Sequence, residues 1–232
     1  MRSSERPHLT NGMTMVVTTL CFLLGSTAFA HGADGVNANA RRHRKGKTVI
    51  SEEFPKAQFS IGKGFRFMGT QRVNLLGNAE AEQYIFAKRG RGSIVERFYL
   101  IQFEHYLPTN NFTYSYASMP AIRMGDLPFN YDVKSWPDLG PLLMEDKSDG
   151  AAMEQLLAKR HLSLPHDAAV VRMFHIPSAD RRMELMILYG EALPPDTAVP
   201  VRKGGVSLLK ESPSSAQMFL EHARQGLIVQ TR

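Results

Sequence analysis

The sequence predicts an α+β protein in which a curved antiparallel sheet of about six to seven strands is covered by a C-terminal helix and one other helix. Three observations lead to this prediction. Most apolar stretches alternate with polar residues at a period of two. Short turns containing glycine or proline join several of these stretches, as in hairpins. Only two segments show the spacing of an amphipathic helix, and one of them lies near the C-terminus.

Two hairpins are the most distinct strand predictions. Glu82–Lys88 and Ser93–Leu107 are separated by a glycine-rich connection, so we expect them to pair antiparallel. Ala168–Ile176 and Met183–Ala192 are expected to pair across Pro177–Asp180 in the same way. Alternation also predicts strands at Ala57–Ile61, at Phe65–Phe67 running into Gln71–Leu76, and at Phe112–Tyr116.

The two helices are expected late in the chain. Ala151–His161 has apolar residues at helical spacing. The last helix has Ser212 as a possible cap, Pro213 at its first position and Gly226 as its end.

The segment Met119–Leu143 is predicted to be a long loop, because prolines and glycines are frequent in it. It contains Trp136, the only tryptophan of the chain. Aromatic residues are concentrated before and within this segment. One hypothesis is therefore an apolar ligand pocket that the loop closes, with Trp136 as its lid.

Residues 1–30 have the pattern of a secretory signal peptide. Two arginines precede a short apolar run, and Ala28-Phe29-Ala30 is a small-residue cleavage site. The run is shorter than the about 20 apolar residues that span a bilayer. We expect an exported protein, periplasmic or extracellular, cleaved after Ala30. Whether Met1 or Met13 is the true start stays open.

The net charge of +6 is concentrated near the N-terminus. From residue 49 onward there are 21 Lys and Arg against 20 Asp and Glu. We expect residues 31–53 to be a flexible basic arm and residues 54–232 to be one α+β domain. An anionic envelope or membrane surface is a candidate partner of the arm, while an exported, nearly neutral body argues against nucleic acid. The basic residues concerned are Arg41, Arg42, Arg44, Lys45 and Lys47.

No cofactor or metal site is expected. The only cysteine, Cys21, lies in the leader, which excludes thiol catalysis and cysteine-ligated metals in the mature chain. His161 and His166 flank a proline and lack the spacing of a helical zinc pair. The nucleophile motifs of secreted hydrolases are also missing.

The stretch Leu100–Pro108 places polar residues in a strand-like segment. Strand alternation puts Gln102, Glu104 and Tyr106 on one face and His105 on the other, among apolar residues. Glu104 and His105 therefore cannot act as a pair. The Gln102 face either meets water or lines a concavity where polar groups would orient a bound molecule.

Arg172 and Glu184 interrupt the otherwise apolar second hairpin. The expected register places Glu184 opposite Phe174 or His175, so that Glu184 could pair with His175 or diagonally with Arg172. This is either a cross-strand ion pair on a solvated face or a charged pair inside a pocket.

We therefore expect a binding module for a small apolar or amphipathic ligand, or for a cell-envelope partner. The alternative is a metal-independent enzyme with Glu104 or Glu184 as general base. Glu104 close to another titratable group in a deep pocket would favour the enzyme, and Glu104 on an open face would exclude it. The candidate ligand-binding residues are Gln102, Glu104, Tyr106, Trp136, Arg172 and Glu184.

Overall fold

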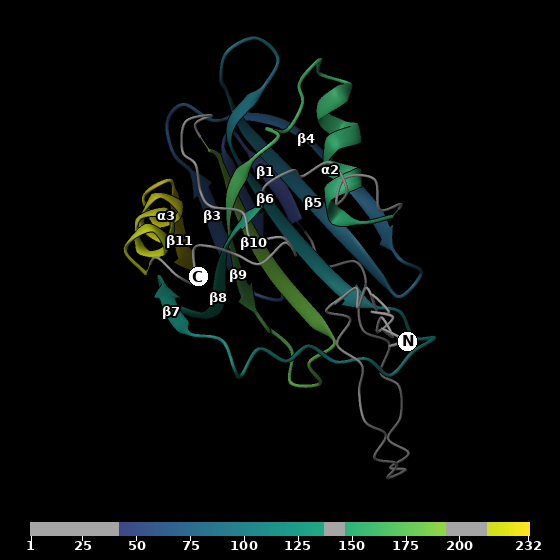
Figure 1. Cartoon of the computed structure of the whole chain (residues 1–232). Coiled ribbons are helices and arrows are strands. Elements are labelled where there is room, and N and C mark those ends of the chain that lie inside the picture. The colour runs from purple at the N-terminus through teal and green to yellow at the C-terminus, as the bar shows by residue number, and fades with distance from the viewer. Residues whose placement is uncertain (1–41, 137–146, 194–212) are drawn as a thin grey trace, which may run out of the picture. The chain divides into compact units, whose positions relative to one another are not determined.

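A computed structural model of the chain describes residues 42–136, 147–193 and 213–232, which all belong to one compact unit (Figure 1). In these ranges the chain forms two antiparallel sheets and two helices. This is the α+β class that the sequence predicts. Neither described helix has the length and apolar character needed to cross a membrane.

The larger sheet has seven strands, is antiparallel throughout and is open, with β4 and β7 at its edges. Both predicted hairpins are confirmed in it, because β5 pairs with β6 and β9 pairs with β10. The two hairpins meet where β6 pairs with β10. In spatial order the strands are β4 (Arg66–Leu75), β5 (Ala79–Arg89), β6 (Val95–Tyr106), β10 (Met183–Ala192), β9 (Ala168–His175), β8 (Leu127–Trp136) and β7 (Ala121–Met124).

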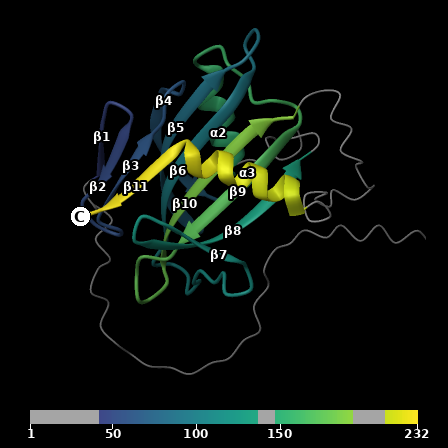
Figure 2. The same cartoon turned by 90° about the vertical axis from the view of Figure 1, so that its left-hand side faces the viewer.

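A second sheet of four strands and the C-terminal helix α3 (Pro213–Gln225) cover one face of the seven-stranded sheet. α3 packs against β8, β9 and β11 (Figure 2). Alternate residues of β6, such as Tyr99 and Ile101, share one core with Phe59 of the second sheet and Leu220 of α3. The four strands, in order, are β1 (Arg42–Lys45), β2 (Thr48–Ser51), β3 (Ala57–Ile61) and β11 (Leu227–Thr231).

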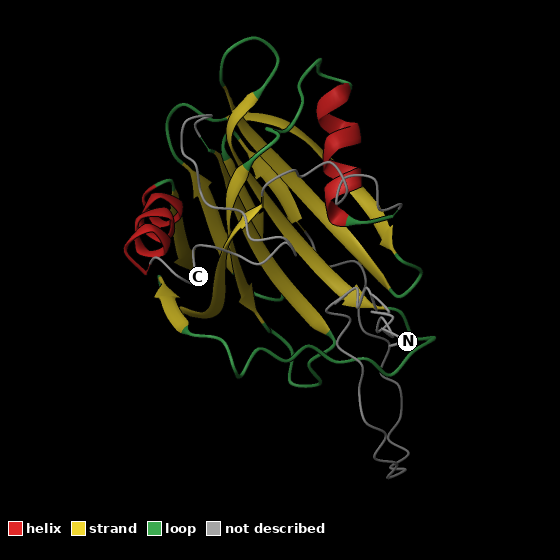
Figure 3. Ribbon diagram, viewed as in Figure 1, coloured by secondary structure: helices red, strands yellow, loops and turns green. Residues whose placement is uncertain are grey.

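The opposite face of the seven-stranded sheet is covered by α2 (Asp149–Ala158), so the two helices flank the strands from different sides (Figure 3). Met153 and Leu157 of α2 pack on the other alternate residues of the sheet, including Phe98 and Leu100. We call this the α2 side. The helix begins where Ser148 accepts a hydrogen bond from the backbone N–H of Ala151 at 3.1 Å.

The folded part begins earlier than the sequence predicts. Residues 42–51, expected to belong to a flexible arm, form the hairpin of β1 and β2. The guanidinium of Arg42 lies 4.2 Å from the centre of the Phe103 ring, and that of Arg44 lies 4.2 Å from the centre of the Phe67 ring. These basic side chains therefore join the two sheets, a use that charge counting does not reveal. The rest of the expected arm lies outside the described residues.

Two further predictions were wrong in detail. Phe112–Tyr116 is not a strand but part of an irregular segment between β6 and β7. The expected loop Met119–Leu143 instead contains the hairpin of β7 and β8. Pro128 is the second residue of β8 and precedes the residues that pair with β9, so the sheet tolerates it there. The remainder of that expected loop, residues 137–146, lies outside the described residues. The C-terminal helix was predicted correctly from Pro213 to Gly226, but the strand β11 after it was missed.

Candidate functional site

Glu104 and Glu184 lie directly opposite each other on neighbouring strands. Glu104 is on β6 and Glu184 on β10, and their Cα atoms are register partners. Strand alternation places both on the α2 side, with Phe98 and Leu100. Opposed residues of an antiparallel pair have Cβ atoms about 4.5–5.5 Å apart. The fold thus brings together two carboxylates that are far apart in the sequence.

Each carboxylate accepts a hydrogen bond from a tyrosine. The hydroxyl of Tyr114 donates to Oε1 of Glu104 at 2.6 Å. The hydroxyl of Tyr116 donates to Oε2 of Glu184. Both tyrosines come from the irregular segment 107–120, which we call the strap. It covers the carboxylates without forming strand or helix.

Aromatic stacking holds the strap on the sheet. The ring of Tyr114 stacks on that of Tyr106 with 4.3 Å between centroids, and the ring of Tyr116 stacks on that of Phe174 with the same separation. Stacked pairs of this kind are worth about 0.5–1.5 kcal/mol beyond the area they bury. Tyr106, a predicted site residue, therefore supports a phenol that bonds to Glu104.

The turn between β9 and β10 fixes the strap through its backbone. Nε and Nη2 of Arg181 both donate to the carbonyl of Tyr114, at 2.8 and 2.7 Å, and the N–H of Tyr114 donates to the carbonyl of Arg181 at 2.8 Å. Arg182 donates through Nη2 to the carbonyl of Leu107 at 2.7 Å. The strap is thus attached mainly by hydrogen bonds to one turn and by two ring stacks.

A row of three glutamines crosses the sheet and ends at Glu104. Gln71, Gln83 and Gln102 are successive register partners on β4, β5 and β6. Gln71 donates to the carbonyl of Ala152 at 2.9 Å and to Gln83 at 2.7 Å, Gln83 donates to Gln102 at 2.7 Å, and Gln102 donates to Oε2 of Glu104 at 2.8 Å. Gln83 and Gln102 are fully buried. The row satisfies buried amides and directs a donor at the carboxylate.

Burial raises the pKa of both carboxyl groups of this pair. Burial raises the pKa of Glu104 to about 7 and the charge of Asp149 adds to this, while hydrogen bonds from Tyr114 and Gln102 lower it. Burial also raises the pKa of Glu184, and the charge of Glu104 raises it further. Opposed carboxylates titrate as a pair, because ionising one disfavours ionising the other. Burial and mutual repulsion therefore both favour the protonated form of the pair.

Asp149 adds a third carboxylate to the α2 side, in the first turn of α2. Its Oδ1 atom is buried and has no hydrogen-bond partner among the described residues. Burial raises the pKa of Asp149, while a hydrogen bond with Gln102 and the charge of Arg172 lower it. Within the described ranges, no group of three or more His, Cys, Asp or Glu side chains is arranged to hold a metal ion.

The predicted pairing of Glu184 with Arg172 or His175 was wrong. Arg172 donates through Nε to Oδ1 of Asp132 on β8, at 2.9 Å. Nδ1 of His175 lies 2.8 Å from the carbonyl oxygen of Pro128, and His175 faces the other side of the sheet. The register of β9 and β10 is shifted by one residue from the position that would place Glu184 opposite His175, so the two side chains lie on different faces.

Three of the six predicted site residues lie together at the centre of the site, and neither of the other two whose side chains the structure describes forms a hydrogen bond with Glu104 or Glu184. Gln102, Glu104 and Glu184 form the centre of the site. Tyr106 stacks behind it, and Arg172 bonds to Asp132. Trp136 ends β8, as register partner of Ala168, and its side chain lies outside what the structure describes.

Sequence reasoning missed Gln71, Gln83, Tyr114, Tyr116 and Asp149. Alternation shows which face of its own strand each glutamine occupies. Only the register of the three strands places the glutamines in one row. Tyr114 and Tyr116 alternate with polar residues, a pattern that predicts a strand rather than a segment lying over the sheet. Their hydroxyl partners lie on β6 and β10, which no local pattern could indicate.

Comparison of the chain with known proteins finds no matching family model, no matching curated protein and no matching solved structure.

Proposed function

We propose that this chain is an exported binding module that holds a small amphipathic molecule on the α2 side of the seven-stranded sheet. The observation that supports this most is the opposed pair Glu104 and Glu184, set beside a cluster of buried apolar residues that α2 covers. Such a site suits a ligand with one polar group, because the carboxylates can orient that group while its apolar part takes the place of the side chains that now cover the sheet.

A purely structural role is a poor explanation for this pair. Glu184 is only 4% exposed, and its position on an apolar face could be filled by an aliphatic residue. Buried charged groups are costly unless fully paired, and apolar replacements of buried ionic groups are often neutral or stabilising. Strongly raised carboxyl pKa values in a covered site are a recognised sign of function.

The chemistry of the pair indicates the ligand's polar group. A partly ionised pair of carboxyl groups accepts hydrogen bonds and attracts positive charge. A primary ammonium or hydroxyl group would replace the donors that Tyr114 and Tyr116 now supply. A carboxylate headgroup would be repelled. The strap covers the pair, so entry requires it to move, and an irregular segment attached mainly at one turn is suited to local opening.

The test compares two amphiphiles of equal chain length, decylamine and decanoate, by isothermal titration calorimetry on the mature chain. We expect decylamine to bind and decanoate to bind at least about tenfold more weakly. The double variant Glu104→Gln/Glu184→Gln should lose this preference. Glu221→Gln, on the exposed part of α3, removes one carboxylate elsewhere and is the control. Equal binding of both amphiphiles to the unmodified chain would refute the proposal.

Export and a resident ligand are tested together by native mass spectrometry of the protein purified from the cells that produce it. We expect a chain that begins at His31 and a non-covalent mass that is lost on denaturation. A chain that retains residues 1–30 would contradict export by cleavage after Ala30.

A metal-independent enzyme is the second candidate, because the pKa of Glu104 is raised to about 7 and a general base works best near the ambient pH. The two candidates differ in the fate of the bound molecule. Incubation of the resident ligand with the protein, followed by mass spectrometry, should return it unchanged for a binding module. For an enzyme it should be converted, and Glu104→Gln should stop conversion while binding persists.

An anionic envelope surface remains a proposed partner of the basic segment. Arg44, Lys45 and Lys47 are exposed there, whereas Arg42 is engaged between the sheets. Binding to vesicles containing phosphatidylglycerol should weaken with salt and with Lys45→Gln/Lys47→Gln. Vesicle binding that salt leaves unchanged would argue against this partner.

A further inference from the structure

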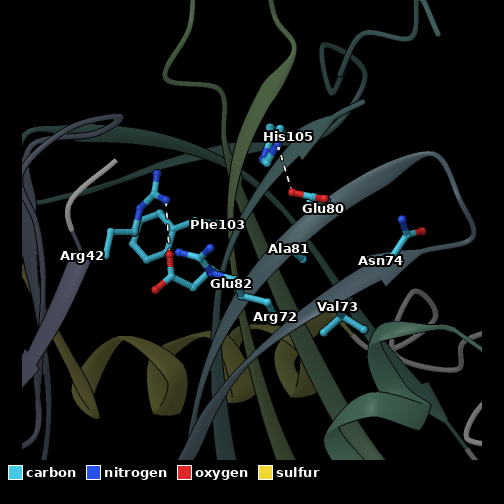
Figure 4. A pocket seen from close by; sticks show the side chains of 9 residues that line it. All are labelled: Arg42, Arg72, Val73, Asn74, Glu80, Ala81, Glu82, Phe103 and His105. Atoms are coloured by element: carbon cyan, nitrogen blue, oxygen red, sulfur yellow. Dashed lines mark ion pairs between the residues drawn. The ribbon is translucent and has the colours of Figure 1, made fainter. Parts of the chain in front are cut away.

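A separate pocket of about 240 Å³ lies where β1 meets the edge of the seven-stranded sheet (Figure 4). Arg42, Arg72, Asn74 and His105 are among its lining residues, and Phe103 forms an apolar wall. Alternation along β6 places Phe103 on the face opposite to Glu104. The pocket is therefore distinct from the carboxylate pair, and a ligand held in it would be independent of the proposed function.

The guanidinium of Arg42 is buried in this pocket with incomplete hydrogen bonding. Only 7% of the side chain is exposed, and its Nε atom has no hydrogen-bond partner among the described residues. Its two polar contacts are long, 3.5 Å from Nη1 to Glu82 and 3.5 Å from Nη2 to the carbonyl of Phe54. Burial lowers the pKa of Arg42, but a guanidinium stays charged in proteins. The Nε of this charged group therefore lacks an acceptor among the described residues.

Arg72 supplies a second cation to the same pocket. It is exposed, and it makes no side-chain hydrogen bond or ion pair within the part of the chain that the structure describes. On β4 it is the register partner of Glu82, and Figure 4 shows the guanidinium groups of Arg42 and Arg72 both directed toward that carboxylate. Glu82 also accepts a hydrogen bond from Tyr84 at 2.6 Å. Glu82 is thus engaged by Arg42 and Tyr84, and Arg72 has no carboxylate partner among the described residues.

His105 lies in the same pocket, and its pKa is lowered mainly by burial. The carboxylate of Glu80 raises this pKa, and the nearby charges of Arg42, Arg182 and Arg72 lower it further. Glu80 lies at the rim with 55% of its side chain exposed and stands 3.7 Å from Nε2 of His105. Solvent screens a carboxylate so exposed, so it does little to neutralise the two arginines.

We propose that this pocket binds a small organic carboxylate, held by the guanidinium groups of Arg42 and Arg72, with its apolar part against the apolar side chains that line the pocket. A carboxylate is planar and matches the fork of donors on arginine. The pocket volume of about 240 Å³ limits the ligand to a small molecule.

The probe is benzoate, titrated into the mature chain by isothermal titration calorimetry, with benzamide as the neutral molecule of the same shape. We expect benzoate to bind at least about tenfold more tightly than benzamide, because only the anion makes charge-assisted hydrogen bonds. Arg72→Gln should weaken benzoate binding by about tenfold. Arg66→Gln, another exposed arginine of β4 that does not line the pocket, should leave it unchanged.

A second measurement keeps the proposal testable if Arg72→Gln alters stability. Bound benzoate adds negative charge beside His105. The pKa of His105, measured by NMR titration, should therefore rise when the protein is saturated with benzoate but not with benzamide. The double variant Glu104→Gln/Glu184→Gln should bind benzoate as the unmodified chain does, so failure here and failure of the proposed function are separate results. Equal affinities of Arg72→Gln and Arg66→Gln for benzoate, or an unchanged pKa of His105, would overturn the proposal.

Discussion

Glu104 on β6 and Glu184 on β10 are directly opposed register partners whose carboxyl groups are each hydrogen-bonded by a tyrosine of the strap. This relationship makes the stability of the fold depend on pH in a direction opposite to that of ion-paired carboxylates. A carboxyl group that is buried with a like-charged neighbour prefers to keep its proton. The folded state therefore binds protons that the unfolded chain releases.

The free energy of unfolding should fall as the pH rises from about 4.5 to about 7. The pKa of Glu104 is raised from 4.5 to about 7 in the folded state. The contribution of its proton to the free energy of unfolding is therefore complete below pH 4.5 and is lost as the pH rises to about 7. Glu184 acts in the same direction. In urea unfolding across this range, the free energy of unfolding of Glu104→Gln should change less with pH than that of the unmodified chain. Above about pH 7 the variant should be up to about 3 kcal/mol more stable. Glu221→Gln should retain the original slope.

Removing the phenol that bonds to Glu104 should weaken the fold. Tyr114→Phe leaves the carboxyl group with one donor fewer, which should cost about 1–2 kcal/mol and raise the pKa of Glu104 further. Carbon-13 NMR titration of the Glu104 carboxyl group measures the second effect. Tyr131→Phe removes a hydroxyl that makes no hydrogen bond in the described ranges. If both variants gave the same titration curve, the hydrogen bond of Tyr114 would not be controlling Glu104.

The strap should open more often when its attachment is removed. Arg181→Gln loses the two hydrogen bonds to the carbonyl of Tyr114. Limited chymotrypsin digestion near Phe112 should then be faster by about tenfold, the factor that corresponds to about 1.4 kcal/mol of opening free energy. Arg160→Gln, in the exposed turn that follows α2, also removes one arginine and is the matched control. Unchanged cleavage in Arg181→Gln would show that other contacts hold the strap.

Gly226 should not tolerate a side chain. A Cβ atom there would lie 2.3 Å from the hydroxyl oxygen of Tyr99, which donates to the carbonyl of Ala223 at 2.7 Å. Gly226→Ala should therefore destabilise the protein by about 2–3 kcal/mol through overpacking. Tyr99→Phe in the same chain should recover part of that loss in urea unfolding. Gly62→Ala, whose Cβ would meet its nearest atom at an ordinary 3.4 Å, is the control and should cost much less.

The hairpins and the helices could be predicted because their signals are local. Alternation in Ser93–Leu107 and in Met183–Ala192, together with short turns, is sufficient to pair neighbouring strands. β1, β2 and β7 were missed because they are short, and β11 because it follows a helix directly. β8 was missed because it lies in a segment where prolines and glycines are frequent, which predicted a loop. Their strand state depends on partners supplied by the rest of the sheet, and tertiary context decides such segments more than composition does.

The sequence by itself determined which side chains share a face. It separated Glu104 from His105 and grouped Glu104 with Gln102, because the strand period of two is a property of the backbone. Only the tertiary structure decided what those faces meet. The pairing of β6 with β10 opposes Glu104 and Glu184, and the strap covers them with Tyr114 and Tyr116. Register between distant strands is set by how all the apolar faces pack together, and a shift of one residue would separate the two carboxylates.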